Sequence, residues 1–259
     1  MKIRVLRILT IAIVVSLCTF IQARAQQIDT VALAKAVITH VDSLLRGKSN
    51  QGVFKMTVVR PDWSRSMTME SWERGQDLSF IEVLEPQKEA GTAFLKREGQ
   101  MWTWLPDIER TIKIPPSMMM ESWMGSDFTN DDLMHESSIV DDYYHGFLGC
   151  DTLEVAPCYV VQLKPKPEVA VVWGRIVVWA RIEDLMPVRE EYYDERGRLI
   201  RTMFLEDIKE MKGRVLPTRW TLVPHLKEGQ KTIFEMIEID FNVKIRDRVF
   251  TRQNLERAR

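Results

Sequence analysis

The spacing of apolar residues changes early in the chain, from a helical period to an alternating one. Between residues 29 and 46, apolar side chains recur every three or four positions, which is the spacing of one face of a helix. Asp29 stands at the position of an N-cap, and Gly47 follows the last apolar turn. This segment therefore predicts one amphipathic helix.

After residue 52, apolar and polar residues alternate instead. The alternation is clear at 53–60, 66–73 and 231–239, and Pro, Gly and Asp residues punctuate it with turns. About eleven strands of this kind follow one another, without the interleaved helices that a parallel sheet requires. The pattern predicts a mainly β (α+β) protein, with one strongly curved antiparallel sheet or incomplete β-barrel after the helix.

The alternation is interrupted between residues 115 and 149. The interruption begins with two prolines and continues with three consecutive methionines, Met118 to Met120. Three neighbouring apolar side chains cannot all face one core from a regular element, so this run favours a lid or gate over ordinary core. Thr129 then stands as the N-cap of a short helix whose first turn is acidic.

Large apolar side chains are concentrated at 101–134, which holds three of the eight Trp and six of the fourteen Met. We expect strand 101–105 to turn its Trp residues toward the hollow of the sheet, and 115–134 to close over that hollow. For these two Trp residues, ordinary core packing is an equally good interpretation. The candidate cavity or lid residues are Trp102, Trp104, Met118, Met119, Met120, Trp123, Met124, Phe128, Leu133 and Met134.

The first 25 residues have the features of a secretory signal peptide. Lys2, Arg4 and Arg7 precede an apolar run over 8–21, which is shorter than the roughly 20 residues that span a bilayer. Small residues at positions 23 and 25 predict cleavage before Gln26. Segment 1–25 is therefore expected to be removed on export, which leaves 26–259 as a single domain.

The charges of the chain nearly balance, with 36 Lys and Arg against 37 Asp and Glu. A basic block of the kind that nucleic acids require is absent from the sequence, so we expect no nucleic-acid partner. The candidate acid–base residues are Asp127, Asp131, Asp132, Asp141, Asp142, His135 and His145. No nucleophile elbow, zinc motif or phosphate-binding Gly-rich loop accompanies them. We interpret these residues as helix caps and solvated loop residues and expect no enzyme activity.

Two cysteines, Cys150 and Cys158, lie beyond the predicted cleavage site. Their short separation in an exported protein predicts a disulfide that would staple a turn, with two free thiols as the alternative. Methionines together with His135 offer ligands for copper, but adjacent methionines are poorly placed to converge on one ion. We therefore expect neither a metal site nor a cofactor.

Three segments together resemble a known group of proteins. They are 101–110 (MWTWLPDIER), 112–115 (IKIP) and, most specifically, 122–133 (SWMGSDFTNDDL). A strand ending at Pro165 and the Leu-Pro-Thr triplet at 216–218 fit as well. With the leader, the helix and the antiparallel strands, they resemble the LolA/LolB-like superfamily, in its divergent branch of outer-membrane lipoprotein-sorting proteins. The resemblance covers essentially all of 26–259.

This resemblance implies an incomplete β-barrel whose apolar hollow is closed by a helical lid and holds acyl chains. It implies a monomeric periplasmic carrier that moves a lipoprotein or lipid toward the outer membrane and contacts membranes transiently. In the divergent branch, association with exporters of the resistance-nodulation-division type is also expected. The alternative function is therefore an accessory module of such an inner-membrane transporter, which binds a non-lipoprotein lipid or no ligand.

Overall fold

The structure is a computed structural model that describes residues 29–134, 138–153, 156–169 and 171–258. The expected signal peptide (1–25) and His135 lie outside these residues, as does the side chain of Met134. In the described part of the chain, no helix is both long and apolar enough to cross a membrane.

The predicted N-terminal helix is confirmed as α2 (Thr30–Leu45). Asp29 caps it by accepting hydrogen bonds from the backbone N–H groups of Val31 and Ala32, at 3.0 and 3.1 Å. One apolar stripe of this helix is buried against the sheet, and it consists of Ala34, Val37, Ile38 and Val41. Helix α2 is thus held by its apolar face, as its sequence period requires.

In the described residues, thirteen strands form one antiparallel sheet, whereas the alternating pattern indicates about eleven. Their bounds are β1 (Ser49–Val59), β2 (Ser64–Arg74), β3 (Leu78–Glu85), β4 (Ala93–Arg97), β5 (Gln100–Leu105), β6 (Arg110–Ile114), β7 (Tyr143–Leu153), β8 (Ala156–Pro165), β9 (Arg175–Arg181), β10 (Pro187–Tyr193), β11 (Leu199–Met211), β12 (Arg214–Pro224) and β13 (Lys231–Phe241). The spatial order is β6-β5-β4-β3-β2-β1-β13-β12-β11-β10-β9-β8-β7. Strands that follow one another in the sequence are neighbours in the sheet, except for β6 and β7, and β1 also pairs with β13.

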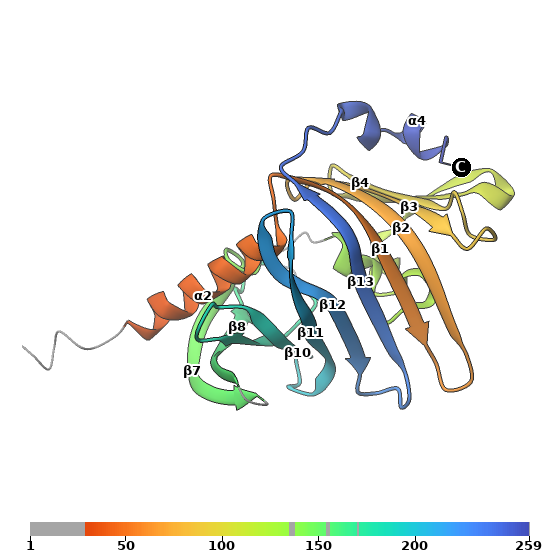
Figure 1. Cartoon of the computed structure of the whole chain (residues 1–259). Helices are drawn as coiled ribbons and strands as arrows, with labels where there is room; N and C mark the ends of the chain where they lie inside the picture. The colour runs from red at the N-terminus through yellow and green to blue at the C-terminus, as the bar shows by residue number, and fades with distance from the viewer. Residues whose placement is uncertain (1–28, 135–137, 154–155, 170, 259) are drawn as a thin grey trace, which may run out of the picture.

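The sheet is curved and open, with β6 at one edge and β7 at the other. The chain that joins these two strands therefore leads from one edge of the sheet to the other. Figure 1 shows the curl, with α2 beside β7 and β8 at one end and the C-terminal α4 (Arg252–Leu255) above β3 and β4 at the other. The predicted curved antiparallel sheet is confirmed.

One prediction about the elements needs correction. The irregular stretch is shorter than 115–149, because β7 already begins at Tyr143. This edge strand carries two glycines, and most of its side chains are exposed or half-buried, so it lacks the apolar alternation that marks the other strands. We call residues 115–134 the insert. It contains the short helical turns η2 (Pro116–Met118) and η3 (Trp123–Gly125) and the helix α3 (Asn130–Met134).

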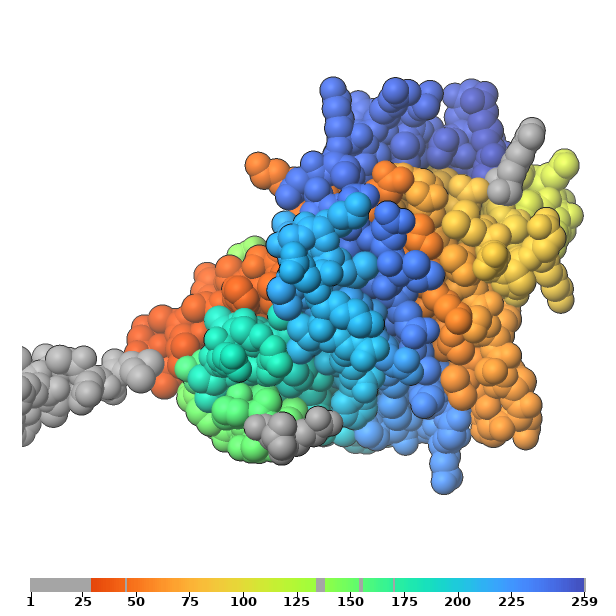
Figure 2. All heavy atoms as spheres, viewed as in Figure 1, coloured from red at the N-terminus to blue at the C-terminus, as the bar shows by residue number. Residues whose placement is uncertain are grey.

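Each face of the sheet carries other parts of the chain over some of its strands. The face that carries α2 and the insert is called the inner face, and the opposite one the outer face. On the outer face, the C-terminal segment of η4 (Asp247–Phe250) and α4 packs on β3, β4 and β5 through Phe250 and Leu255. Figure 2 shows this dark blue segment resting on the orange and yellow strands.

Candidate functional site

The insert packs its apolar side chains onto the methionine-rich half of the inner face. Trp123 is only 3% exposed, and its ring lies 5.3 Å from that of Phe94, edge to face. Beneath the insert, strands β1, β2 and β5 contribute buried methionines to the same cluster. The buried sheet methionines are Met56, Met67, Met69 and Met101, and the insert adds Met119, Met124, Phe128 and Leu133.

An aromatic group continues this surface toward the middle of the sheet. Phe128 of the insert contacts Phe234 of β13 with a ring separation of 6.2 Å. Phe234 in turn stacks on Trp220 of β12 at 5.5 Å and touches Phe54 of β1 at 5.0 Å. The inner face thus presents methionine and aromatic side chains, both of which accommodate apolar ligands of variable shape.

A tight turn places Trp123 under the insert. Ser122 and Thr129 form a β-bridge, and the N–H of Trp123 donates to the carbonyl oxygen of Phe128 at 2.8 Å. Between them, Met124 and Gly125 both have positive φ angles, of 50° and 72°. Glycine adopts this conformation without strain, whereas Met124 is held in it by the turn. The Trp-Met-Gly-Ser segment thus forms a closed loop that turns its Trp toward the sheet.

Two ionic contacts fasten the insert to the sheet, and the first lies where β1 ends. Arg60 donates to Asp127 at 3.0 Å and to the carbonyl oxygen of Gly125 at 2.7 Å. Thr232 of β13 donates to the same carboxylate at 2.7 Å. Arg65 donates to the carbonyl oxygen of Met124. The Asp127 side chain is only 2% exposed, so its charge depends on these donors.

The second ionic contact joins α3 to β11. Arg201 binds both carboxylate oxygens of Asp132, at 2.7 and 2.6 Å, which is the bidentate geometry of strong ion pairs. The Asp132 side chain is 14% exposed and that of Arg201 is 7% exposed. The guanidinium carbon of Arg201 also lies 4.4 Å from the ring centroids of Trp173 and Tyr192.

Charge and burial oppose each other around Arg201. Burial disfavours ionisation of Asp132, but the hydrogen bonds and the positive charge of Arg201 lower the pKa of this carboxyl overall. Burial raises the pKa of Glu190, although Tyr192 donates a hydrogen bond to it and Arg201 attracts its charge. Burial also raises the pKa of Tyr192, with the nearby Glu190 adding to the effect. Asp132 is therefore the principal negative partner of Arg201.

The predicted helix cap in the insert is present. Thr129 precedes α3, and its hydroxyl accepts from the N–H of Asp132 at 3.2 Å, while Asp132 accepts from the N–H of Thr129 at 2.8 Å. One carboxylate thus completes the cap and binds Arg201. The sequence predicts the Thr129 cap but not the ion pair between Asp132 and Arg201.

The candidate residues fall into three groups in the structure. Those of the insert that pack on the inner face are Met119, Trp123, Met124, Phe128 and Leu133. Met118 and Met120 lie on the insert but are 43% and 52% exposed, so only the middle methionine of the run points into the cluster.

The prediction that Trp102 and Trp104 face the hollow is wrong. Both pack on the outer face, in the cluster that holds the C-terminal segment. Met101, also in β5, faces the insert. Alternation along β5 makes these placements mutually exclusive, because neighbouring side chains point to opposite faces.

The predicted disulfide between Cys150 and Cys158 is wrong, since both are free cysteines. Cys150 stands opposite Tyr159 and Asp151 stands opposite Cys158 in the β7–β8 pair. The two thiols are therefore one residue out of register and lie on opposite faces, with Cys150 exposed and Cys158 buried.

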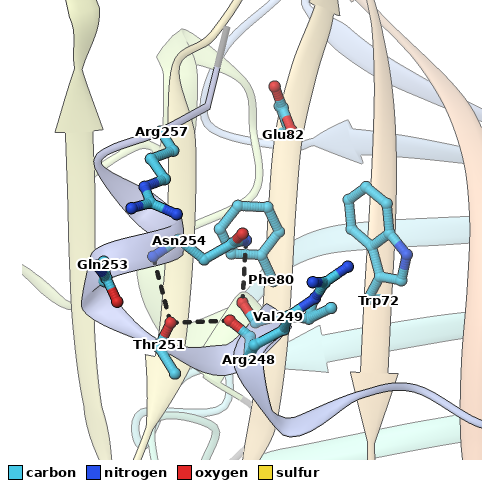
Figure 3. A pocket seen from close by; sticks show the side chains of 9 residues that line it. All are labelled: Trp72, Phe80, Glu82, Arg248, Val249, Thr251, Gln253, Asn254 and Arg257. Carbon is cyan, nitrogen blue, oxygen red and sulfur yellow. Dashed lines mark hydrogen bonds between the residues drawn. The ribbon is translucent and has the colours of Figure 1, made fainter.

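A cavity of about 440 Å³ lies on the outer face, between β2, β3 and the C-terminal segment. Figure 3 shows the side chains of Arg248, Arg257 and Asn254 around it, with Trp72 and Phe80 contributed by the sheet. Two arginines and an amide are poorly suited to acyl chains. This cavity is separate from the inner face.

Comparison with known proteins supports the fold. The model of a family described as "-like: Uncharacterized protein" matches residues 75–257. A DUF1329 family protein from Desulfovibrio piger superposes with a TM-score of 0.78, at 23% identity over 88% of this chain and 100% of that chain. A LolA superfamily protein from Nitrosomonas europaea gives a TM-score of 0.72, at 20% identity over 85% and 98%.

A structure described as an outer membrane lipoprotein-sorting protein domain, from Vibrio parahaemolyticus, gives a TM-score of 0.74, at 18% identity over 87% of this chain and 99% of that chain. No curated protein sequence matches the chain at a significant level. These likenesses establish that the fold is the LolA-like fold that the sequence resemblance implied.

Proposed function

Since the chain belongs to the family whose model matches residues 75–257, and since its fold is LolA-like, we propose that it is a non-enzymatic periplasmic carrier of acyl chains. In this proposal the inner face holds the chains of a lipoprotein or lipid, and the insert is the lid. The protein would take its cargo from one membrane, cross the periplasm as a monomer and deliver the cargo toward the outer membrane.

The observation that carries the proposal is the chemistry of the contact between the insert and the sheet. Methionine side chains on both sides can repack around chains of different shape, because the thioether is flexible. Burying each methylene of a chain contributes about 0.8 kcal/mol, which is enough for reversible binding of a few chains. An empty carrier must hide such a surface from water, and the insert covers it here.

Opening the lid requires the release of its two ionic contacts, Asp127 with Arg60 and Asp132 with Arg201. Charged contacts regain hydration when they separate, whereas an apolar contact of similar size does not. The lid is therefore held by two ion pairs and by a methionine-rich contact between them. When it opens, acyl chains can replace the lid's own apolar side chains on the inner face.

The test is a reversible cross-link. Asp127 and Thr232 contact each other at 2.7 Å across the lid and the sheet, so cysteines at both positions can be joined by an oxidant or a short bifunctional reagent. The variant also carries Cys150→Ser, because Cys150 is exposed. We expect the cross-linked protein to lose binding of a fluorescent acyl probe and to regain it after reduction.

A matched control lies on the outer face. Thr111 of β6 donates to Glu256 of the C-terminal segment at 3.1 Å, so a cysteine pair there fastens the other cover in the same way. This cross-link should leave probe binding unchanged. Equal loss in both variants, or no probe binding by the reduced protein together with no lipid in organic extracts of periplasm-purified protein, would contradict the proposal.

A second candidate function is an accessory module of a resistance-nodulation-division type exporter. The observation that favours it is that the insert already fills the inner face. In that role the insert would stay closed and the protein would bind an inner-membrane transporter. It predicts that locking the lid leaves transporter capture intact, whereas a carrier needs the lid to move.

A further inference from the structure

The contact between Asp132 and Arg201 is a built anion site occupied by the protein's own carboxylate. Arg201 is buried, and it offers two parallel donors to the carboxylate and two aromatic rings to its flanks. Its Nε atom is also buried and has no hydrogen-bond partner, so the guanidinium retains an unused donor. Bidentate arginines of this kind recognise carboxylates and phosphates by their geometry.

The position of Arg201 is as informative as its geometry. In β11 it shares the inner face with Leu205, and in the neighbouring strand it stands opposite Tyr192. Tyr192 and Trp173 pack against the aliphatic cluster under α2, while Asp132 belongs to the insert that covers the methionine cluster. Arg201 therefore lies between the two apolar halves of the inner face.

We infer that the cargo carries an anionic headgroup, a carboxylate or a phosphate, which replaces the Asp132 carboxylate on Arg201 when the lid opens. This inference rests on the carrier function proposed above and narrows its cargo to anionic lipids. Acyl chains that start at Arg201 can then run onto the methionine cluster that the lifted insert uncovers.

The exchange follows from the cost of an unpaired buried charge. If the insert lifts and nothing replaces Asp132, Arg201 remains among apolar and aromatic side chains without its principal counter-ion. Glu190 is a weaker substitute, because burial raises its pKa and its carboxylate is already engaged by Tyr192. An anionic headgroup restores the lost contact, whereas a neutral headgroup does not.

The direct test compares ligands that share one chain and differ in the headgroup. Dodecanoate, dodecyl phosphate and dodecanol would displace a neutral fluorescent acyl probe from the wild-type protein at pH 7.5, below their aggregation concentrations. We expect both anions to bind at least about tenfold more tightly than dodecanol, as charged hydrogen bonds predict. The ranking of the two anions then identifies the source of the negative charge.

Three variants separate recognition from simple latching. Asp132→Asn removes the competing carboxylate, so it should strengthen binding of the anions by more than binding of dodecanol. Arg201→Gln should abolish the preference for anions. Arg189→Gln is the matched control, because Arg189 lies on the outer face, where it contacts Glu191 and lies 4.8 Å from the ring centroid of Trp179. It should leave the preference unchanged.

The failures of the two proposals are distinguishable. Dodecanol binding as tightly as the anions, or Arg201→Gln changing all three affinities in parallel, would overturn the anionic headgroup while leaving the carrier function intact. If none of the three ligands displaces the probe because the probe itself does not bind, the carrier function falls as well. The wild-type ranking does not depend on any variant folding.

Discussion

Strands β3, β4 and β5 are covered on both faces, and the two covers differ in kind. On the inner face the insert packs through methionines together with Trp123 and Phe128. On the outer face the C-terminal segment packs Phe250 and Leu255 on Trp72, Trp102 and Trp104. The inner contact is rich in methionine, whose side chain is flexible, whereas the outer contact is rich in tryptophan.

The fastenings differ as well. The inner cover is held by buried ion pairs with Arg60 and Arg201. The outer cover has a backbone contact, Arg97 to the carbonyl oxygen of Phe250 at 3.0 Å, and an ion pair of Arg74 with the exposed Asp247. The same strands thus carry two covers, and the proposed carrier function assigns ligand exchange to the inner one only. If the carrier proposal holds, the outer cover stabilises the sheet and the inner cover opens to admit the ligand.

The largest expected effect comes from the outer cover. Phe250 is 1% exposed, and Phe250→Ala should lower the free energy of unfolding by about 3–5 kcal/mol, because it leaves a cavity against β3 and β4. Urea denaturation measures the loss. The acyl probe should bind the folded variant with unchanged affinity, and a specific loss of probe binding would show that the outer cover shapes the ligand site.

The next effect is local. Arg60→Gln removes the charge that compensates the buried Asp127 carboxylate, which should cost about 3 kcal/mol in the closing of the insert. Amide hydrogen exchange should then accelerate in 119–131 while the amides of β3 and β4 stay protected. Uniform acceleration across the sheet would mean that the insert is part of the global core.

A smaller effect is expected from Glu190, and its sign depends on pH. Burial raises the pKa of this carboxyl above 4.5, so the folded state holds its proton more tightly than the unfolded state. That contribution to stability is complete below pH 4.5 and is lost as the pH rises through the folded-state value. Glu190→Gln should therefore stabilise the protein by on the order of 1 kcal/mol at pH 8 and hardly at all at pH 4.5.

Urea denaturation of wild type and Glu190→Gln at the two pH values measures this difference. The control is Glu191→Gln, which changes the neighbouring carboxylate on the outer face, where it accepts a hydrogen bond from Tyr193. A gain that is equal at both pH values would assign the effect to packing instead of to the buried charge.

The parts of the fold and of the candidate site that the sequence predicts are those that depend on local patterns of residues. The helix at 30–45, the alternating strands and the Thr129 cap depend on neighbouring residues, and all were predicted. The placement of Trp102 was not, because both faces of β5 are covered and apolar residues therefore stand at inner and outer positions alike. Alternation identifies a strand, but it selects a face only where one side is polar.

The ionic fastenings were missed for a related reason. Arg201 and Asp132 are 69 residues apart, and Arg60 and Asp127 are 67 apart, so only the curl of the sheet brings them together. An arginine in an alternating strand is otherwise typical of a solvated face. The sequence does carry a signal for the methionine-rich inner face, because Met67 and Met69 stand two residues apart and therefore share one face of β2.

The smallest expected effect tests whether the flexibility of the methionine side chains in the insert widens the range of acyl chain lengths that the protein binds. Met119→Leu conserves volume, so it should change the free energy of unfolding by less than about 1.5 kcal/mol. Leucine is stiffer than methionine, so the variant should bind one probe chain length nearly as well as wild type and lose affinity for longer and shorter chains. Met186→Leu, at a buried methionine next to β10, is the control with no expected change in chain-length range. If Met119→Leu keeps the full range, the adaptability of the lid must come from its motion as a unit, released at Arg60 and Arg201, and the methionines would serve only as apolar filling.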